Sequence, residues 1–229
     1  DRIKTEDKRD AQAQFYLPFR PIVFGGDDVT FICDGRLGIS LAITYLHAFE
    51  QATAVHLGEA NKLTACAGVT IVKSHYPFAQ AYHLAEDLLK KAKRYRQQQK
   101  ATGSFIDWHF ALTGLSGSIN HIREREYETD EGSLTLRPVA LSGTDYRSWA
   151  VIERGLQIFQ DLDAHEQQEE ADWSTRRNKI KALRDVLRQG PTAVEHFRRR
   201  FLDNQLLPQL PGGMSNWPSQ GWQGTYCGY

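Results

Sequence analysis

Two short apolar runs flank a glycine–aspartate cluster near the start of the chain. The first run covers residues 21–24, and the second covers residues 29–33, in which alternate positions are apolar. The four residues between them, 25–28, have the sequence Gly-Gly-Asp-Asp. Strand-like runs separated by such a turn cluster predict a β-hairpin.

Hydrophobic spacing predicts two helices and two more strands after this hairpin. Apolar positions recur at helical spacing over residues 37–52. Residues 63–72 and 104–112 predict buried strands, and Pro77 between them favours the first turn of a helix with a cationic C-terminal end. This order of elements predicts an α+β fold with one mostly antiparallel sheet and helices on one face.

The second half of the chain is predicted to be mainly helical. Residues 121–141 first predict another β-hairpin, turned at 129–133. Three apolar stripes then predict helices with a break at Gly190-Pro191, and residues 203–229 predict a Pro/Gly-rich loop or tail. The stripes are Trp149, Ile152, Leu156 and Phe159; Ile180, Leu183 and Leu187; and Val194, Phe197 and Phe201.

Composition excludes several classes of protein. The 229 residues, 41% of them hydrophobic, are enough for one globular domain or a domain with a smaller appendage. With 28 basic and 28 acidic residues, no overall field draws the chain to nucleic acid. The sequence has no membrane-length apolar run and no signal-peptide pattern. Its 3 cysteines lack metal-ligand spacing, which fits a reducing cytoplasm.

Charge is distributed unevenly in the helical region. Residues 161–172 contain six acidic side chains and no basic one, whereas residues 176–200 contain nine basic and two acidic side chains. Two interpretations stay open. The charged helices face each other or water, or the basic segment contacts RNA or a partner protein.

The adjacent carboxylates of Asp27 and Asp28 are candidate metal ligands. Their like charges repel, and a divalent cation removes that repulsion. Mg²⁺ takes one or two protein carboxylates together with water and substrate phosphate oxygens. Gly25 and Gly26 lack a Cβ, so phosphates can approach the backbone, and they tolerate the positive φ of tight turns. The alternative is that this tetrapeptide is only a good hairpin turn.

The flanking residues carry a family resemblance. Residues 20–33, with the sequence RPIVFGGDDVTFIC, resemble the GGDD hairpin of palm domains in the polymerase-like large subunit of type III CRISPR effector complexes. They also resemble stand-alone relatives of that subunit. Residues 63–72 are similar to the next core strand of these palms, and residues 76–93 are similar to the helix that follows, which is also found in GGDEF diguanylate cyclases. The resemblance covers about residues 18–142.

This resemblance implies a ferredoxin-like palm that uses a nucleoside triphosphate, ATP first, and Mg²⁺ or Mn²⁺. Asp27 and Asp28 would then be the catalytic metal ligands, and Gly25 and Gly26 would lie beneath the phosphates. Lys93 matches the phosphate-contacting lysine of the cyclase helix, although an ordinary solvated lysine is an equal alternative. The product would be a cyclic nucleotide or cyclic oligonucleotide made for antiviral defence.

Three departures from the family pattern affect this expectation. Position 97 is glutamine where diguanylate cyclases have arginine, and Asp28-Val29 replaces Glu-Phe, which favours the CRISPR-type palm. Palms of this kind also begin with a strand and a helix before the hairpin, and that strand offers another metal-binding aspartate. The predicted domains are therefore an N-terminally incomplete palm over 1–143 and a helical appendage with a Pro/Gly-rich tail over 144–229.

Three classes of function follow from these observations. The first is a cytoplasmic metal-dependent nucleotidyltransferase or cyclase, which would also form a homodimer because cyclases of this type pair. The second is a non-catalytic palm that binds nucleotide or scaffolds an RNA-guided complex through RNA or other subunits. The third is an α/β interaction protein with a fortuitous turn. Asp107, Trp108 and His109 share a predicted strand, where packing is the expected role of each.

Overall fold

The computed structural model describes residues 17–111, 117–160 and 176–203, together with residues 207, 222–223 and 226–227. Residues 1–14, which are mostly polar, and the acidic segment 161–172 lie outside these described residues.

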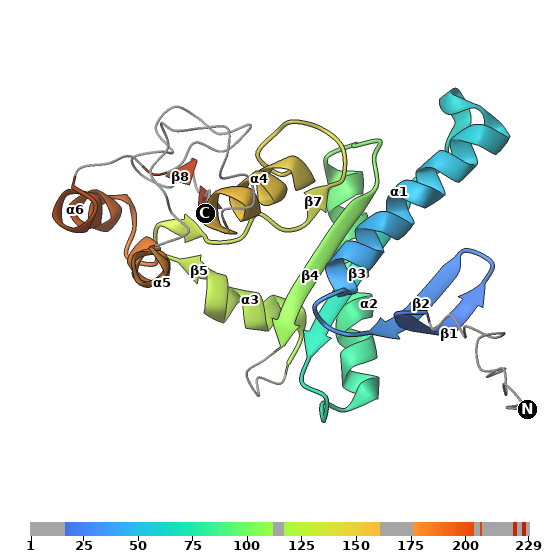
Figure 1. Cartoon of the computed structure of the whole chain (residues 1–229), viewed down its shortest axis with the longest axis horizontal. Helices are drawn as coiled ribbons and strands as arrows, with labels where there is room; N and C mark the ends of the chain where they lie inside the picture. Colours follow the sequence, from blue (N-terminus) through green and yellow to red (C-terminus); the bar gives the residue numbers. More distant parts are fainter. Residues whose placement is uncertain are drawn as a thin grey trace, which may run out of the picture.

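The predicted hairpin at the start of the chain is confirmed. Strands β1 (Phe19–Gly25) and β2 (Asp28–Cys33) pair antiparallel as a separate two-stranded sheet. Their register places Phe24 opposite Val29 and Gly25 opposite Asp28, with an irregularity after Pro21. Proline has no N–H to donate to a ladder, which suits it to such an irregular position. Figure 1 shows the hairpin projecting from one side of the molecule.

A parallel strand pair forms the centre of the fold. Strands β3 (Cys66–Val72) and β4 (Phe105–Ala111) run parallel in a register that starts with Cys66 opposite Phe105. Helix α2 (Phe78–Gln98) makes the crossover that a parallel pair requires. The short strand β7 (Val139–Ala140) then adds to β4 antiparallel. The central sheet is thus mixed, and its order is β3-β4-β7.

Helices cover both faces of this pair, which differs from the expected one-face arrangement. Successive residues of a strand point to opposite faces. Gly68 lies against the backbone of α2, whereas Val69 lies against Gly38 in helix α1 (Gly38–Leu57). Two separate clusters of buried residues follow from this alternation. Both faces of β3 are therefore apolar in sequence because a helix covers each of them.

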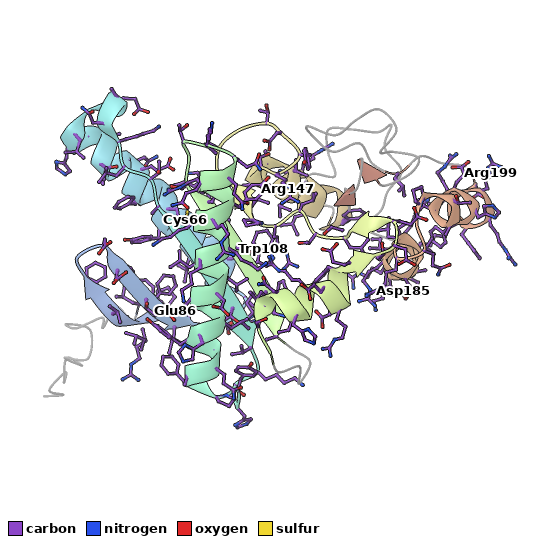
Figure 2. The ribbon with its side chains drawn as sticks, turned by 180° about the vertical axis from the view of Figure 1, so that it is seen from behind. Cys66, Glu86, Trp108, Arg147, Asp185 and Arg199 are labelled. Atoms are coloured by element: carbon purple, nitrogen blue, oxygen red, sulfur yellow. The ribbon has the colours of Figure 1, made fainter. Side chains whose placement is uncertain are left out.

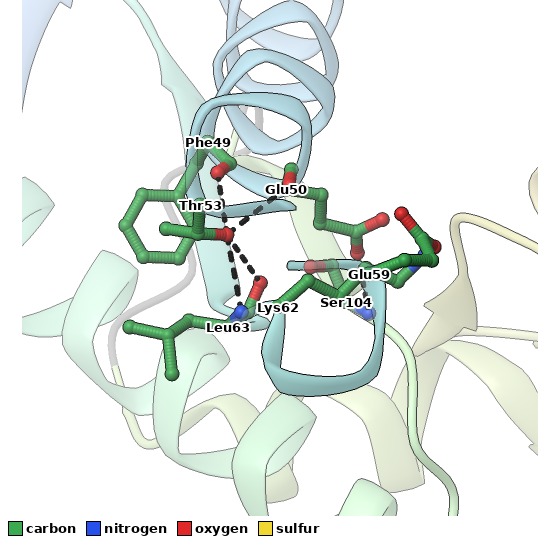
Figure 3. A network of polar contacts seen from close by, with 7 residues as sticks. All are labelled: Phe49, Glu50, Thr53, Glu59, Lys62, Leu63 and Ser104. Atoms are coloured by element: carbon green, nitrogen blue, oxygen red, sulfur yellow. Dashed lines mark hydrogen bonds and ion pairs between the residues drawn. The ribbon is translucent and has the colours of Figure 1, made fainter. Parts of the chain in front are cut away.

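A small polar network joins the C-terminal half of α1 to the starts of β3 and β4 (Figure 3). The Thr53 hydroxyl donates to the carbonyl oxygen of Phe49 at 3.0 Å and accepts from the backbone N–H of Leu63, also at 3.0 Å. The backbone N–H of Ser104 donates to the Glu50 carboxylate at 3.1 Å. These contacts secure the connection between α1 and β3, which contains the 3-10 helix η1 (Glu59–Asn61).

The predicted hairpin over 121–141 is partly wrong. Residues up to 127 form helix α3 (Ile119–Tyr127), because Ser118 caps its first turn by accepting from the backbone N–H of His121. Ile119 and Ile122 are buried at helical spacing. The predicted turn is nevertheless present, since β5 (Glu128–Thr129) and β6 (Gly132–Ser133) pair antiparallel on either side of it.

The three predicted helices of the second half are confirmed as α4 (Trp149–Gln160), α5 (Arg177–Leu187) and α6 (Pro191–Phe201). Gly190, with φ +87°, and Pro191 form the predicted break between α5 and α6. In the predicted tail, β8 (Trp222–Gln223) and β9 (Tyr226–Cys227) form strands that join β5 and β6 in one sheet. Strand pairing with distant residues explains why local composition did not reveal them.

These elements confirm the α+β class. The predicted division between residues 143 and 144 stays a prediction, and helix α4 packs across it: Trp149 makes an edge contact with Trp108 at 6.2 Å between ring centroids. Helices α5 and α6 pack around a third apolar cluster. Among the described helices, none has the length and apolar character needed to cross a membrane.

Replacing Gly68 by alanine is expected to lower the free energy of unfolding by about 3 kcal/mol, because the close packing of β3 on α2 leaves no space. An added Cβ would lie 2.2 Å from the carbonyl oxygen of Ala85 and 2.5 Å from the backbone nitrogen of Leu89. Urea unfolding followed by circular dichroism measures the change. Gly25→Ala is the matched control, since nothing lies within 4 Å of its Cβ position. Equal stability of the two variants would contradict the packing described.

Candidate metal and nucleotide site

The Gly-Gly-Asp-Asp turn is a tight two-residue connection. Gly25 and Asp28 are opposite each other in the strand register, so Gly26 and Asp27 form the loop. Gly26 has φ +62°, a left-handed conformation that side chains other than glycine disfavour, while Asp27 is not among the described non-glycine residues with positive φ. A glycine with positive φ at the first loop position is typical of a type II′ hairpin turn.

The carboxylates of Asp27 and Asp28 are both exposed at this turn. Across the described parts of the chain, neither carboxylate takes part in a hydrogen bond or ion pair with another residue. Two adjacent, hydrated carboxylates are the hard oxygen donors that Mg²⁺ or Mn²⁺ prefers, with water and phosphate oxygens as the other ligands. The residues at the turn therefore fit a partial divalent-cation site.

This donor set is small. Within the described ranges, no group of 3 or more His, Cys, Asp or Glu side chains converges in a way that could hold a metal. The next acidic residue along the hairpin, Asp34, follows the far end of β2 and accepts from the Arg36 guanidinium at 2.9 and 3.0 Å. These hydrogen bonds lower the pKa of Asp34 to about 2. Asp34 is thus engaged elsewhere, and the turn offers two carboxylates.

Space above the two glycines is open. Cβ atoms built on Gly25 and Gly26 would have no neighbour within 4 Å. The backbone of the turn is therefore accessible to a large anionic group such as a triphosphate.

Lys93 lies exposed on α2, and no ion pair or hydrogen bond joins it to Asp27 or Asp28. Its charge acts on Cys66 at the start of β3, where burial raises the pKa of the thiol and Lys93 is among the cations that oppose this shift. The base of the hairpin instead approaches the later part of β3, where a Cβ added to Gly35 would lie 3.0 Å from a methyl group of Ile71. The assignment of Lys93 as a phosphate ligand stays a prediction.

Asp107 has the structural role expected from its strand position. It is fully buried on β4, and the Arg123 guanidinium of α3 donates to both of its carboxylate oxygens, at 2.5 and 2.9 Å. Arg123 also donates to the carbonyl oxygen of Trp108 at 3.2 Å. Arg137 donates to the same carbonyl oxygen at 2.6 Å, and its guanidinium lies 5.6 Å from the centre of the Trp108 ring.

Sequence reasoning did not single out Arg123 or Arg137. Arg123 follows Ile122 on the buried face of the short helix α3. Helical spacing over 119–127 would have indicated this position, but a β-hairpin was predicted there instead. Figure 2 shows Trp108 within the central part of the molecule.

His109 is buried beside this cluster and stays neutral. Loss of solvent, together with the positive charges of Arg137 and Arg123, lowers the pKa of His109 to about 4 against the opposing effect of Asp107. Its Nδ1 atom is buried and has no hydrogen-bond partner among the described residues. A neutral imidazole next to two guanidinium groups suits packing better than proton transfer.

Removing the guanidinium of the buried pair is expected to destabilise the fold strongly. Arg123→Met leaves the Asp107 carboxylate uncompensated in the interior, so the free energy of unfolding should fall by about 3–5 kcal/mol. Adding Asp107→Leu to this variant removes the buried charge and should restore most of the loss. Urea unfolding of the single and double variants measures both effects, and a double variant no more stable than Arg123→Met would refute this account.

Stability is also expected to depend on pH through His109. The imidazole titrates near 6.5 in the unfolded chain and near 4 in the fold, so between these values the unfolded chain binds more protons. The contribution is fully present above pH 6.5 and is lost as the pH falls towards 4. As the pH falls through this window, the free energy of unfolding of the natural protein should decrease by up to about 1.4 kcal/mol per pH unit more than that of His109→Gln. Urea unfolding at several pH values measures these free energies. The same pH dependence in both proteins would contradict the lowered pKa of His109.

Comparison with protein families bears on the hairpin directly. Residues 9–102 match the family described as Cas10/Cmr2, second palm domain. The matched segment contains the hairpin, α1, β3 and α2. No curated protein matches the chain. The segment 9–102 is therefore similar to a palm domain of the Cas10/Cmr2 type, as the Gly-Gly-Asp-Asp hairpin predicted.

Proposed function

We propose that this chain is a metal-dependent nucleotidyltransferase that condenses a nucleoside triphosphate, ATP first, into a cyclic nucleotide or cyclic oligonucleotide. The observation that carries the proposal is the pair of exposed carboxylates at a glycine turn, which bond to no other described residue, within a segment that matches a Cas10/Cmr2 palm. The product would act as a messenger in CRISPR-type antiviral defence, in the cytoplasm.

In this proposal Asp27 and Asp28 hold Mg²⁺ or Mn²⁺. A bound divalent ion supplies charge stabilisation for the triphosphate and activates the attacking hydroxyl group. The residues of the turn position the metal ion and the triphosphate. Gly26 turns the backbone so that both carboxylates stand at the tip of the hairpin, and the absence of a Cβ at Gly25 leaves space for phosphate oxygens. Lys93 is the proposed phosphate contact on α2.

A second candidate is a palm that binds nucleotide or scaffolds an effector complex without catalysis. The observation that favours it is the apolar surface of the hairpin: Phe24, next to the turn, is 80% exposed, and Ile22 and Ile32 are 44% and 45% exposed. Grouped exposed apolar side chains mark protein contacts more often than isolated ones do. Other effector subunits or a second copy of the chain are the proposed partners of this surface.

Asp27→Asn/Asp28→Asn is expected to abolish product formation, with a loss of at least about a hundredfold, because neutral amides bind Mg²⁺ poorly. The natural protein and the variant are incubated with labelled ATP and Mg²⁺ or Mn²⁺, and the products are separated by chromatography. Both side chains are exposed and make no described contact, so the thermal unfolding midpoint should not change.

Asp130→Asn/Glu131→Gln is the matched control for this experiment. These residues are another adjacent pair of exposed carboxylates in a two-residue hairpin turn, between Thr129 and Gly132. The control should keep full activity. Activity that survives in Asp27→Asn/Asp28→Asn would overturn the proposed enzyme. Calorimetric ATP binding without any product, retained in that variant, would instead support the second candidate.

A further inference from the structure

The helix pair α5–α6 forms a basic unit at the end of the molecule opposite the hairpin (Figure 1). Residues 176–203 contain nine basic side chains and three acidic ones, which gives this segment a formal charge of +6. Its helices are anchored by their own apolar core, in which Leu187, Val194 and Leu202 are almost fully buried. The charge therefore sits on an ordered scaffold.

A groove of about 780 Å³ lies between the end of α5 and the length of α6. The groove is shallow and open to solvent, so one side of a bound nucleotide would stay in water. The lining residues are Val186, Gln189, Thr192, Ala193, His196, Phe197, Arg199, Arg200 and Phe201.

Cations line one end of this groove. Arg199 and Arg200 are exposed in the last turn of α6, and Figure 2 shows Arg199 at the outer end of the molecule. Glu195 accepts from Arg198 at 3.0 Å and from Arg199 at 2.8 Å, and these hydrogen bonds lower its pKa. Because one carboxylate pairs with two arginines, the groove keeps a net positive charge that favours the binding of phosphate groups.

An aromatic ring stands beside these cations. Phe201 is 49% exposed, although it is a large apolar side chain, and it rests on the buried ring of Phe197 at 5.3 Å between centroids. The Arg200 guanidinium lies 5.3 Å from the centre of the Phe201 ring. A fixed, half-exposed ring next to a guanidinium group offers two flat surfaces on which a nucleobase stacks.

We propose that this groove binds one unit of a single-stranded nucleic acid, with a base stacked on Phe201 and the adjoining phosphates held by Arg199 and Arg200. An acidic protein would satisfy the charge but would not use the exposed ring, so the two features together favour a nucleic acid over a protein. The site is separate from the Gly-Gly-Asp-Asp turn, which lies at the other end of the molecule.

Fluorescence anisotropy with a labelled oligouridylate of about twelve nucleotides tests this proposal on the full chain, at several salt concentrations. Arg199→Ala/Arg200→Ala should raise the Kd at least about tenfold and reduce the salt dependence, measured as the slope of log Kd against log salt, by about 1.4. Phe201→Ala should raise the Kd about fivefold or more and leave that slope unchanged, because stacking releases no counterions.

Arg177→Ala/Lys181→Ala is the matched control, since it removes two exposed cations from the same helix pair outside the groove lining. A Kd within about threefold of the natural protein supports a defined site. An equal loss in this control and in Arg199→Ala/Arg200→Ala would overturn the groove in favour of diffuse attraction. Phe201→Ala with unchanged affinity would overturn base stacking. Displacement of the RNA by polyglutamate at equal charge concentration would assign the groove to an acidic protein instead.

Discussion

The buried ion pair between Asp107 and Arg123 is the interaction on which the rest of the structure depends. A carboxylate with no exposure can remain charged only if its oxygens are paired, and the guanidinium supplies two hydrogen bonds at once. This pair fixes α3 against β4. At the far end of α3, Arg188, which follows α5, donates to the backbone carbonyl oxygen of Glu126 at 2.7 Å. The central sheet and the basic helix pair are thereby connected through one short helix.

The central sheet and the hairpin have opposite physical characters. Strands β3 and β4 lie between helices on both faces, and the buried residues of β4 tolerate little change in volume or charge. The hairpin forms a sheet of its own, and its adjacent carboxylates face water. Two like charges side by side would be costly inside the core, but hydration screens them at an exposed turn until a cation binds. The arrangement thus keeps reactive charge outside the packed part of the fold.

Much of the fold could be predicted from local patterns, and the failures have a common cause. Apolar periodicity predicted the hairpin, both central strands and the helices that carry Trp149, Leu183 and Phe197, since burial of one face or both leaves a repeat in the sequence. The helix from Ile119 was missed because nine residues are too few for a clear helical repeat, and the N-cap Ser118 is its main local signal. Strands β8 and β9 were missed because each is two residues long and gains stability from distant partners.

The sequence by itself determined the candidate site at the hairpin tip. Gly26 permits the left-handed turn, and the adjacent Asp27 and Asp28 must then stand together, because turn geometry depends on neighbouring residues alone. Only the tertiary structure decided that helices cover both faces of β3 and β4, and that Asp107 pairs with an arginine. These facts depend on contacts between residues far apart in the chain, and such contacts follow from the packing of the whole fold, which no local repeat encodes.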